Sequence, residues 1–261
     1  MDPEAVLAQF DARMRQYAPA DGTGSRVERV GDVVRQVGAD RDWNGWTGVI
    51  WSDVDADTAD AAIQAQVGYF TAEEREFEWK LYAHDRPHDL GARLEAAGFT
   101  PEPQETLMVA EAAELSTEVR LPEGVRLCQV TEPAELDLVT DVHEAAFGEP
   151  DTWLGDQLRA QLAESATSVV VVVAMAGEVP VSAARLELLP GTPFAGLWGG
   201  GTVPEWRGRG IYRALIAYRA RIAAECGYRY LQVDASSESS PILRRLGFAA
   251  LSTTTPYVYR P

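Results

Sequence analysis

Hydrophobic and polar positions in the second half of the chain follow two different periods, which predicts a mixed α/β fold. Alternating or continuously apolar runs predict strands at Val125–Val130, Ser168–Ala176, Val179–Leu189, Phe194–Val203, Tyr228–Val233 and Thr253–Tyr259. Apolar residues at helical spacing predict helices at Pro133–Phe147, Thr152–Ala163, Gly208–Cys226 and Pro241–Leu246. Because the long helix lies between two predicted strands, we expect one right-handed β-α-β crossover around it.

The first half of the chain reads as an altered copy of the second. Aligning Gly98 with Gly247, an offset of 149 residues, places a strand at Phe77–Ala83 and a helix at Asp57–Phe70 on matching elements of the second half. The landmarks that agree are Trp51 and Trp198, Asp85 and Asp234, Leu94 and Leu243, Gly98 and Gly247, and Phe99 and Phe248. This agreement indicates a degenerate internal repeat. The alternative is a chance match between generic α/β patterns.

A change of composition marks the division between the two copies. An Ala/Glu-rich segment covers Ala110 to Glu118, and Pro122 and Gly124 punctuate the residues after it. We therefore place a boundary near residue 117, with domains at 1–116 and 117–261. A chain of 261 residues is long enough for two small domains.

Several classes of protein are excluded by what the sequence lacks. The longest apolar run, Val169 to Ala176, is too short for a membrane-spanning helix, and the N-terminus has neither the basic nor the apolar part of a secretory signal. The two cysteines, Cys128 and Cys226, have neither zinc-site nor disulfide-framework spacing, so we expect a reducing, cytoplasmic location. A P-loop and a serine nucleophile elbow are both absent.

The distribution of charge points to one region that suits an anion. The formal net charge is −17, which opposes binding to nucleic acid and to anionic membranes. Residues 201–261 nevertheless carry nine arginines against four acidic side chains, a net charge of +5. An anionic ligand is therefore expected in this last part of the chain.

The segment from Thr202 to Leu215 concentrates the features of such a site. A predicted strand ends at Val203, a glycine-containing basic loop follows, and a helix begins between Gly208 and Gly210. The unpaired amides and the dipole of a helix start attract anions, glycines allow close approach, and Arg207 and Arg209 add full charges. The loop is therefore predicted to bind a phosphate or pyrophosphate. The alternative is a solvated turn whose arginines serve solubility.

The motif Val203-Pro-Glu-Trp-Arg-Gly-Arg-Gly210, followed later by Leu246-Gly-Phe248, resembles the GCN5-related N-acetyltransferase (GNAT) superfamily over about residues 120–261. The resemblance implies a mixed, mostly antiparallel sheet flanked by helices in each copy, and acetyl-CoA as co-substrate. It also implies that Thr202 and Val203 pair with the pantetheine arm. The pyrophosphate would be held by the backbone of Arg207, Gly208, Arg209, Gly210, Ile211 and Tyr212.

The sequence departs from the family pattern at three positions. Tyr212 stands where the family usually has Gly or Ala, so its ring would either crowd the phosphate or point into the core. Leu243 occupies the position of a tyrosine that in many members protonates the departing thiolate, and Ser236 replaces the usual asparagine. The resemblance therefore predicts acetyl-CoA binding without identifying the general acid.

The N-terminal copy has an acidic loop at the equivalent place. Ser52 to Asp57 contains three aspartates, which suit a helix start themselves and would repel a pyrophosphate. We infer that this copy does not bind CoA and supplies structure and part of the acceptor pocket. The chain then resembles a tandem GNAT protein with one active half, a pseudo-dimer in one chain.

Acetyl transfer to an amine needs a base, an oxyanion donor and departure of the thiolate. A backbone N–H near Val203 is the expected oxyanion donor, and Gly199-Gly200-Gly201 predicts a bulge that frees such groups. Asp234 is a candidate base, although its match to Asp85 favours a turn or cap role for both. Glu144 and Glu149 are the alternative bases.

Tyr257 on the last strand is the candidate for protonating the thiolate, which is itself a fair leaving group. His84 to Asp89 contains residues that bind metals, but the proline and acidic caps explain its composition, and no metal is expected.

The leading function is an acetyl-CoA-dependent N-acetyltransferase acting by direct attack of a small amine, which the acidic body would attract if it is cationic. Acetylation of a protein or peptide amine, or of a mycothiol-type intermediate, stays open. A non-catalytic acyl-CoA sensor is the alternative from another class. Either a monomer with pseudo-dimer symmetry or a homodimer fits the sequence.

Overall fold

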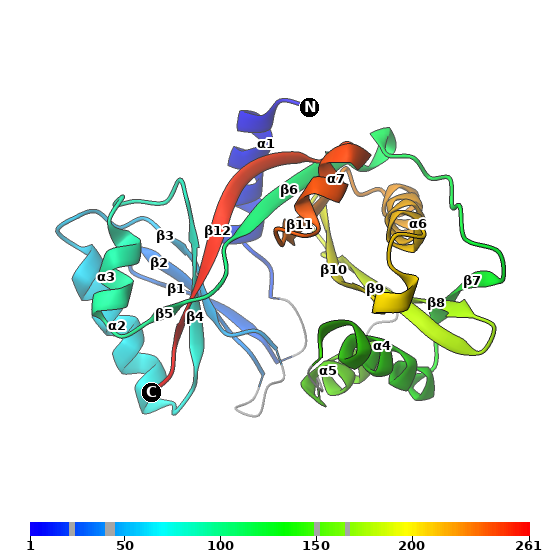
Figure 1. The fold of residues 1–261 in the computed structure, drawn as a ribbon. Helices are drawn as coiled ribbons and strands as arrows, with labels where there is room; N and C mark the ends of the chain where they lie inside the picture. Colours follow the sequence, from blue (N-terminus) through cyan, green and yellow to red (C-terminus); the bar gives the residue numbers. More distant parts are fainter. Residues whose placement is uncertain (21–23, 40–44, 149–151, 165–167) are drawn as a thin grey trace. The chain divides into compact units, whose positions relative to one another are not determined.

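A computed structural model describes the chain except for residues 21–23, 40–44, 149–151 and 165–167 (Figure 1). The chain forms two compact units. Unit 1 comprises Met1–Met108, Asp234–Ile242 and Ala249–Pro261, and unit 2 comprises Val109–Val233 and Leu243–Phe248. Within the described residues, no helix combines the length and apolar character needed to cross a membrane.

Unit 1 is built around a sheet in the strand order β1-β2-β3-β4-β12, with β5 also pairing to β12. Its strands are β1 (Arg26–Val30), β2 (Val33–Val37), β3 (Gly48–Ser52), β4 (Phe77–Tyr82), β5 (Thr100–Pro101) and β12 (Ala249–Tyr259). Its helices are α1 (Pro3–Phe10), the π-helical η1 (Asp11–Gln16), α2 (Ala59–Ala72) and α3 (Leu90–Ala96). Among the described strand pairs of this unit, only β3 and β4 run parallel.

Unit 2 contains a second set of strands in the order β11-β10-β9-β8-β7. They are β7 (Val125–Val130), β8 (Val169–Ala176), β9 (Val179–Leu188), β10 (Phe194–Thr202) and β11 (Tyr230–Ala235). The helices are η2 (Ala112–Glu114), η3 (Pro133–Leu136), α4 (Asp137–Phe147), α5 (Thr152–Glu164), η4 (Pro204–Trp206) and α6 (Ile211–Glu225). Strands β6 (Glu105–Glu111) and β11 and helix α7 (Ser240–Leu246) contain residues of both units.

The compact units divide the chain differently from the expected boundary near residue 117. The division falls inside β6, between Met108 and Val109. The last strand, β12, was expected with residues 117–261, yet it pairs antiparallel with β4, with Tyr257 opposite Trp79 (Figure 1). This pairing joins positions about 180 residues apart, so no local pattern announces it. The assignment of 1–116 and 117–261 to two repeated copies stays a prediction.

The predicted strands and helices are confirmed, with ends that shift by a few residues. The long helix begins at Ile211 rather than at Gly208. Gly208 and Gly210 have φ of 74° and 86°, a left-handed conformation that a right-handed helix does not contain. The glycines therefore belong to the loop before the helix.

Local geometry recurs at the aligned positions of the two halves. In each half a helix, α2 or α6, connects two parallel strands. Gly98 and Gly247 both have positive φ, 99° and 105°, after a short helix. In each half, the amide of the phenylalanine after the glycine donates to the carbonyl of the leucine five residues earlier. Phe99 N bonds Leu94 O at 3.1 Å, and Phe248 N bonds Leu243 O at 3.1 Å. These matching contacts support the internal repeat.

The apolar run of β8 is explained by helices on both faces of the unit 2 sheet. Val171 and Val173 pack in a cluster with residues of α4 and α5, whereas Val172 and Ala174 pack in a second cluster with residues of α6. Because successive side chains of a strand point to opposite faces, a strand covered on both sides is apolar throughout.

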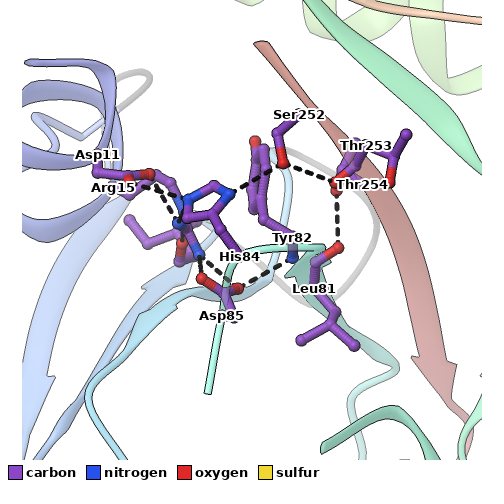
Figure 2. Close-up of polar contacts among 10 residues, drawn as sticks. Asp11, Arg15, Leu81, Tyr82, His84, Asp85, Ser252, Thr253 and Thr254 are labelled. Atoms are coloured by element: carbon purple, nitrogen blue, oxygen red, sulfur yellow. Dashed lines mark hydrogen bonds and ion pairs between the residues drawn. The ribbon is translucent and has the colours of Figure 1, made fainter. Parts of the chain in front are cut away.

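A buried arginine organises the polar interior of unit 1 (Figure 2). Arg15 on η1 donates to both carboxylate oxygens of Asp85 at 2.8 and 2.7 Å, to Asp11 at 2.7 Å and to the carbonyl of Ile50 at 3.0 Å. Its guanidinium also lies over the ring of Tyr82, 4.1 Å from the centroid. Asp85 in turn accepts the Tyr82 amide at 2.9 Å, which confirms the turn role expected for Asp85.

His84 has structural partners in the same network. Its Nε2 contacts Asp11 Oδ2 at 2.9 Å, and its Nδ1 contacts Ser252 Oγ at 2.9 Å. An ionised carboxylate only accepts, so the Nε2–H of His84 donates this hydrogen bond to Asp11. Within the described part of the chain, His, Cys, Asp and Glu residues form no group of three or more placed to hold a metal ion.

Candidate functional site: the β10 edge and the loop before α6

The site in unit 2 starts with a bulge in β10. The register between β10 and β9 shifts between Trp198 and Gly201, which confirms the bulge predicted at Gly199-Gly200-Gly201. Gly199 adopts φ of 58°, a left-handed conformation that glycine tolerates best. The bulge therefore re-aims the backbone that follows it.

Strand β10 separates from β11 before the bulge. Their parallel pairing joins Phe194, Ala195 and Gly196 to Tyr230, Leu231 and Gln232, and no later pair is described between these strands. The β10 edge on the β11 side is therefore left without ladder partners beyond Gly196 in the described structure. A strand edge of this kind can pair with an extended ligand.

The geometry of β10 shows which backbone amide near Val203 is free to meet a ligand. The Val203 amide donates to the carbonyl of Val181 on β9 at 3.0 Å, so it is not free for a ligand. Thr202 lies opposite Ser182 at the adjacent position of the antiparallel pair. Because neighbouring peptide groups point to opposite edges, the N–H of Thr202 faces away from β9. Thr202, rather than Val203, presents an amide to the unpaired edge.

The loop after β10 is exposed at Arg207, Gly208, Arg209 and Gly210. The Arg207 amide donates to the Pro204 carbonyl at 3.2 Å, so the candidate donors to a ligand begin at Gly208. Helix α6 then begins at Ile211 with no side chain capping it among the described contacts. Amides of a helical first turn have no partner inside the helix, and the left-handed Gly208 and Gly210 on either side of Arg209 give the loop a backbone that suits anions. A pyrophosphate site at this loop stays a prediction.

The two loop arginines have different surroundings. Arg207 donates from Nε to the Thr202 carbonyl at 3.0 Å and from Nη2 to the Ala146 carbonyl at the end of α4 at 2.9 Å. It therefore ties the loop to β10 and α4 while keeping its charge beside the amides. Arg209 lies over the ring of Trp206, 4.6 Å from the centroid. This contact holds its guanidinium at the exposed surface of the loop.

Tyr212 points toward β10 and leaves the loop open. Its ring lies so close to Gly200 that a Cβ at that position would be 2.9 Å from Cε2. Burial raises the pKa of the Tyr212 hydroxyl, with the nearby Arg219 guanidinium acting in the opposite direction. The ring therefore packs inside unit 2, which settles the two possibilities left open by the sequence.

Gly201 meets a similar constraint from a different helix. A Cβ there would lie 2.9 Å from Phe147 and 3.1 Å from Ala146, both on α4. Each of the three consecutive glycines is thus required for its own reason. Gly199 has a left-handed φ, Gly200 is approached by a side chain of α6, and Gly201 is approached by side chains of α4. A small recess beside the bulge is lined by apolar residues of α4, α5 and β9 together with His143 and Arg185.

The candidate catalytic side chains lie in different environments. Glu144 is exposed on α4, whereas Glu149 lies outside the described residues. Asp234 belongs to unit 1 and forms an ion pair with Lys80, Oδ2 to Nζ at 2.5 Å. Tyr257 packs in the apolar core of unit 1, with its hydroxyl 2.5 Å from where a Cβ of Gly91 would lie. Burial raises the pKa of this tyrosine.

The residues at the two other departures from the family pattern have structural roles. Leu243 is fully buried, and the Ser236 hydroxyl accepts the Ser239 amide at 3.3 Å beside α7. Neither Leu243 nor Ser236 can supply the phenolic hydroxyl that the family's tyrosine provides.

In the acidic loop of unit 1, a carboxylate binds backbone amides of the turn just before α2. Asp55 Oδ1 accepts the backbone N–H of Asp57 at 3.0 Å and of Thr58 at 2.9 Å, and also the Thr58 hydroxyl at 2.9 Å. These hydrogen bonds, led by that of the Thr58 side chain, lower the pKa of Asp55. A carboxylate therefore occupies the place that is open in the loop before α6.

A splayed strand edge followed by exposed amides at a helix start is the arrangement that the resemblance to the GNAT superfamily implies. Residues 136–248, which include this whole site, match the model of the Acetyltransferase (GNAT) family. This part of the chain is therefore a GNAT-type acetyltransferase domain. Among curated proteins, none matches this sequence significantly.

Solved structures show the same fold over nearly the whole chain. A GCN5-related N-acetyltransferase from Kribbella flavida is 20% identical, with a TM-score of 0.70, and the match covers 99% of this chain and 94% of that one. A conserved protein of unknown function from Staphylococcus epidermidis is 14% identical, with a TM-score of 0.70 and coverage of 94% and 96%. A tandem GNAT protein from the clavulanic acid biosynthesis pathway is 13% identical, with a TM-score of 0.63 and coverage of 92% and 84%.

Proposed function

We propose that the chain transfers an acetyl group from acetyl-CoA to the amine of a small, cationic acceptor. The observation that carries this proposal is the open loop between Arg207 and Tyr212, directly after a strand edge that has separated from its neighbour. The loop amides would hold the pyrophosphate, and the β10 edge at Thr202 would pair with the pantetheine arm. The basic character of residues 201–261 supports the same assignment.

Catalysis would consist mainly of holding the thioester and the amine in position. The Thr202 amide would stabilise the oxyanion of the tetrahedral intermediate. The amine nitrogen attacks the thioester carbon, the carbon–sulfur bond breaks, and the proton lost by the amine balances the charge of the thiolate. The acid and base assignments of Tyr257, Asp234 and Glu144 stay predictions, and only Glu144 is both exposed and within unit 2.

We further propose that only one of the two halves binds acetyl-CoA. The support is the Asp55 carboxylate, which accepts the amides of Asp57 and Thr58 in the turn before α2 and leaves those two amides no role toward a phosphate. The chain would then bind one acetyl-CoA. The structure of the tandem GNAT neighbour agrees with a two-domain arrangement. A cytoplasmic location and a monomeric or homodimeric state belong to the same proposal.

A non-catalytic acyl-CoA sensor is the second candidate. It is favoured by the buried Leu243 at the position of the family's tyrosine. Release of free thiol from acetyl-CoA across a panel of small amines distinguishes the two functions. Amine-dependent thiol release is expected for the transferase, whereas stoichiometric acetyl-CoA binding without turnover would establish the sensor.

A further inference from the structure

The recess beside the β10 bulge contains one permanently charged side chain. Its lining consists of apolar residues and glycines except for His143 on α4 and Arg185 on β9, and every lining residue belongs to unit 2. The recess is small, so it can receive the end group of a ligand rather than a whole molecule. The chemistry of that end group is set by the charged residue in the lining.

Arg185 lies on the face of the sheet that α4 and α5 cover. It is directly opposite Val171 on β8 and Trp198 on β10, and residues opposite one another in antiparallel strands share a face. Val171 packs in a cluster with residues of α4 and α5. The Arg185 guanidinium reaches the bulge, with Nη1 3.3 Å from where a Cβ of Gly199 would lie. The cation is therefore beside the bulged segment of β10, within the same unit as Thr202.

The Arg185 guanidinium has donors that no described contact uses. Its Nε donates to Glu187 Oε1 at 3.1 Å, whereas no hydrogen bond is described for Nη1 or Nη2. The side chain is only 14% exposed. A guanidinium has five N–H donors, and its two terminal nitrogens form a fork that fits a carboxylate. Donors held largely out of water without an acceptor are costly, so this fork calls for an acceptor from a ligand.

A second guanidinium makes the surroundings of Arg185 more positive. Arg219 on α6 is 1% exposed, and its Nη1 donates to the backbone carbonyl of Arg185 at 2.9 Å. The described ion pairs include none for Arg219. Burial lowers the pKa of Arg219 to about 10, with Tyr212 opposing this shift and Arg185 adding to it. Two guanidiniums are thus accompanied by one described carboxylate, Glu187, and an anionic group at the recess would balance the excess charge.

The distance from the recess to the proposed oxyanion donor limits the size of the ligand. Three residues separate Gly199 from Thr202, which is at most about 10 Å of extended chain. A ligand with a carboxylate at Arg185 and an amine at the thioester carbon therefore has its two ends apart by several carbon atoms. An ω-amino carboxylate fits this separation, whereas an α-amino acid carries its carboxylate beside the amine.

We propose that the acetyl acceptor is an ω-amino carboxylate whose carboxylate binds Arg185 in the recess beside the bulge. Naming the ligand as the acceptor rests on the function proposed above, whereas the anion subsite itself does not. The ammonium end keeps the positive charge that suits the acidic chain, and it loses a proton before it attacks. The carboxylate is unchanged by the reaction. Arg185 is thus a binding residue that selects the acceptor.

The test compares the acetylation of ε-aminocaproate with that of its amide, ε-aminocaproamide. The two share an amine and a chain length and differ in the charge of the far end. We expect kcat/KM to be at least about tenfold higher for the acid, through a lower KM. Arg185→Met should remove this preference. Arg221→Met, at an exposed position of α6, is the matched control and should keep it.

Arg185→Lys provides a second variant that keeps the positive charge. A lysine lacks the paired donors of the fork, so the preference for the acid should be reduced without being reversed. Equal kcat/KM for the acid and the amide in the wild type overturns the proposal. An unchanged preference in a folded Arg185→Met overturns it as well. Should Arg185→Met fail to fold, a full wild-type preference in Arg185→Lys overturns the paired contact.

A binding measurement separates this proposal from the proposed function. The full chain is titrated with ε-acetamidocaproate, which has a carboxylate and no amine, and with NaCl at the same ionic strength. Saturable binding of ε-acetamidocaproate that Arg185→Met abolishes supports the anion subsite without any acetyl transfer. If that binding is found and no amine is acetylated, the proposed function fails and the subsite stands. If amines are acetylated without preference for the acid, the subsite fails and the function stands.

Discussion

The ring of Tyr212 packs against Gly200, so closely that the strand has no room for even one methyl group at that position. This contact explains how a large residue is accommodated at a loop position where the family usually has Gly or Ala. The ring turns from α6 onto the bulged segment of β10, and the amides between Gly208 and Tyr212 stay open. The two residues therefore act as a pair in shaping the site.

Gly200→Ala tests this pairing. The added Cβ would lie 2.9 Å from Tyr212 Cε2, so the ring must move. We expect a loss of about 1–3 kcal/mol in the free energy of unfolding, as for other overpacked positions, together with weaker CoA binding. Urea unfolding and calorimetric titration measure the two effects. The double variant Gly200→Ala/Tyr212→Phe keeps the ring and should recover neither the stability nor the CoA affinity. The double variant Gly200→Ala/Tyr212→Ala removes the ring and should recover the stability. A Gly200→Ala variant with unchanged stability would contradict the contact.

Arg15→Met tests the polar network of unit 1. Removing the guanidinium leaves Asp85 buried without its cation, which costs about 3–5 kcal/mol in comparable cases. The effect is measured by urea unfolding at pH 7. Arg13→Met, two residues away and exposed, should change the stability little. Similar stability of the two variants would show that the network does not hold unit 1 together.

The titration of Glu105 predicts a pH dependence of stability. Burial raises its pKa in the folded chain to about 7, so the folded chain binds the proton more tightly than the unfolded chain. The free energy of unfolding should therefore fall as the pH rises from about 4.5 to about 7. Above that range, the contribution of Glu105 should no longer change with pH. Subtracting the pH profile of Glu105→Gln isolates this contribution. A difference that is flat across pH 5–7 would contradict the raised pKa.

The sequence predicts those structural features that are determined by residues close together in the chain. The valine run of β8 and the bulge at the three glycines follow from local patterns, and the structure confirms them. The position of the loop before α6 follows from the same kind of pattern. Its anion-binding role stays a prediction, which rests on the general behaviour of helix starts and glycines.

Long-range pairings account for what the sequence did not predict. The pairing of β12 with β4 and the ion pair of Lys80 with Asp234 join residues more than 150 positions apart. The sequence alone therefore presents Asp234 as a candidate base, since nothing near it in the chain indicates its pairing with Lys80. The single lysine of the chain is the signal that could have drawn attention to this ion pair. The free amide at Thr202 follows from strand register, which depends on the alignment of β9 with β10.

The most direct test of the account is calorimetric titration of CoA into the wild-type chain and Arg209→Glu. The account predicts binding of one CoA by the wild type. It predicts affinity more than about a hundredfold weaker in the variant, because a carboxylate then faces the pyrophosphate. Arg221→Glu, ten residues after the first residue of α6 and so about 15 Å along the helix from its start, should bind CoA as the wild type does. Circular dichroism confirms that both variants are folded. Undiminished CoA binding by a folded Arg209→Glu would contradict the assignment of the loop.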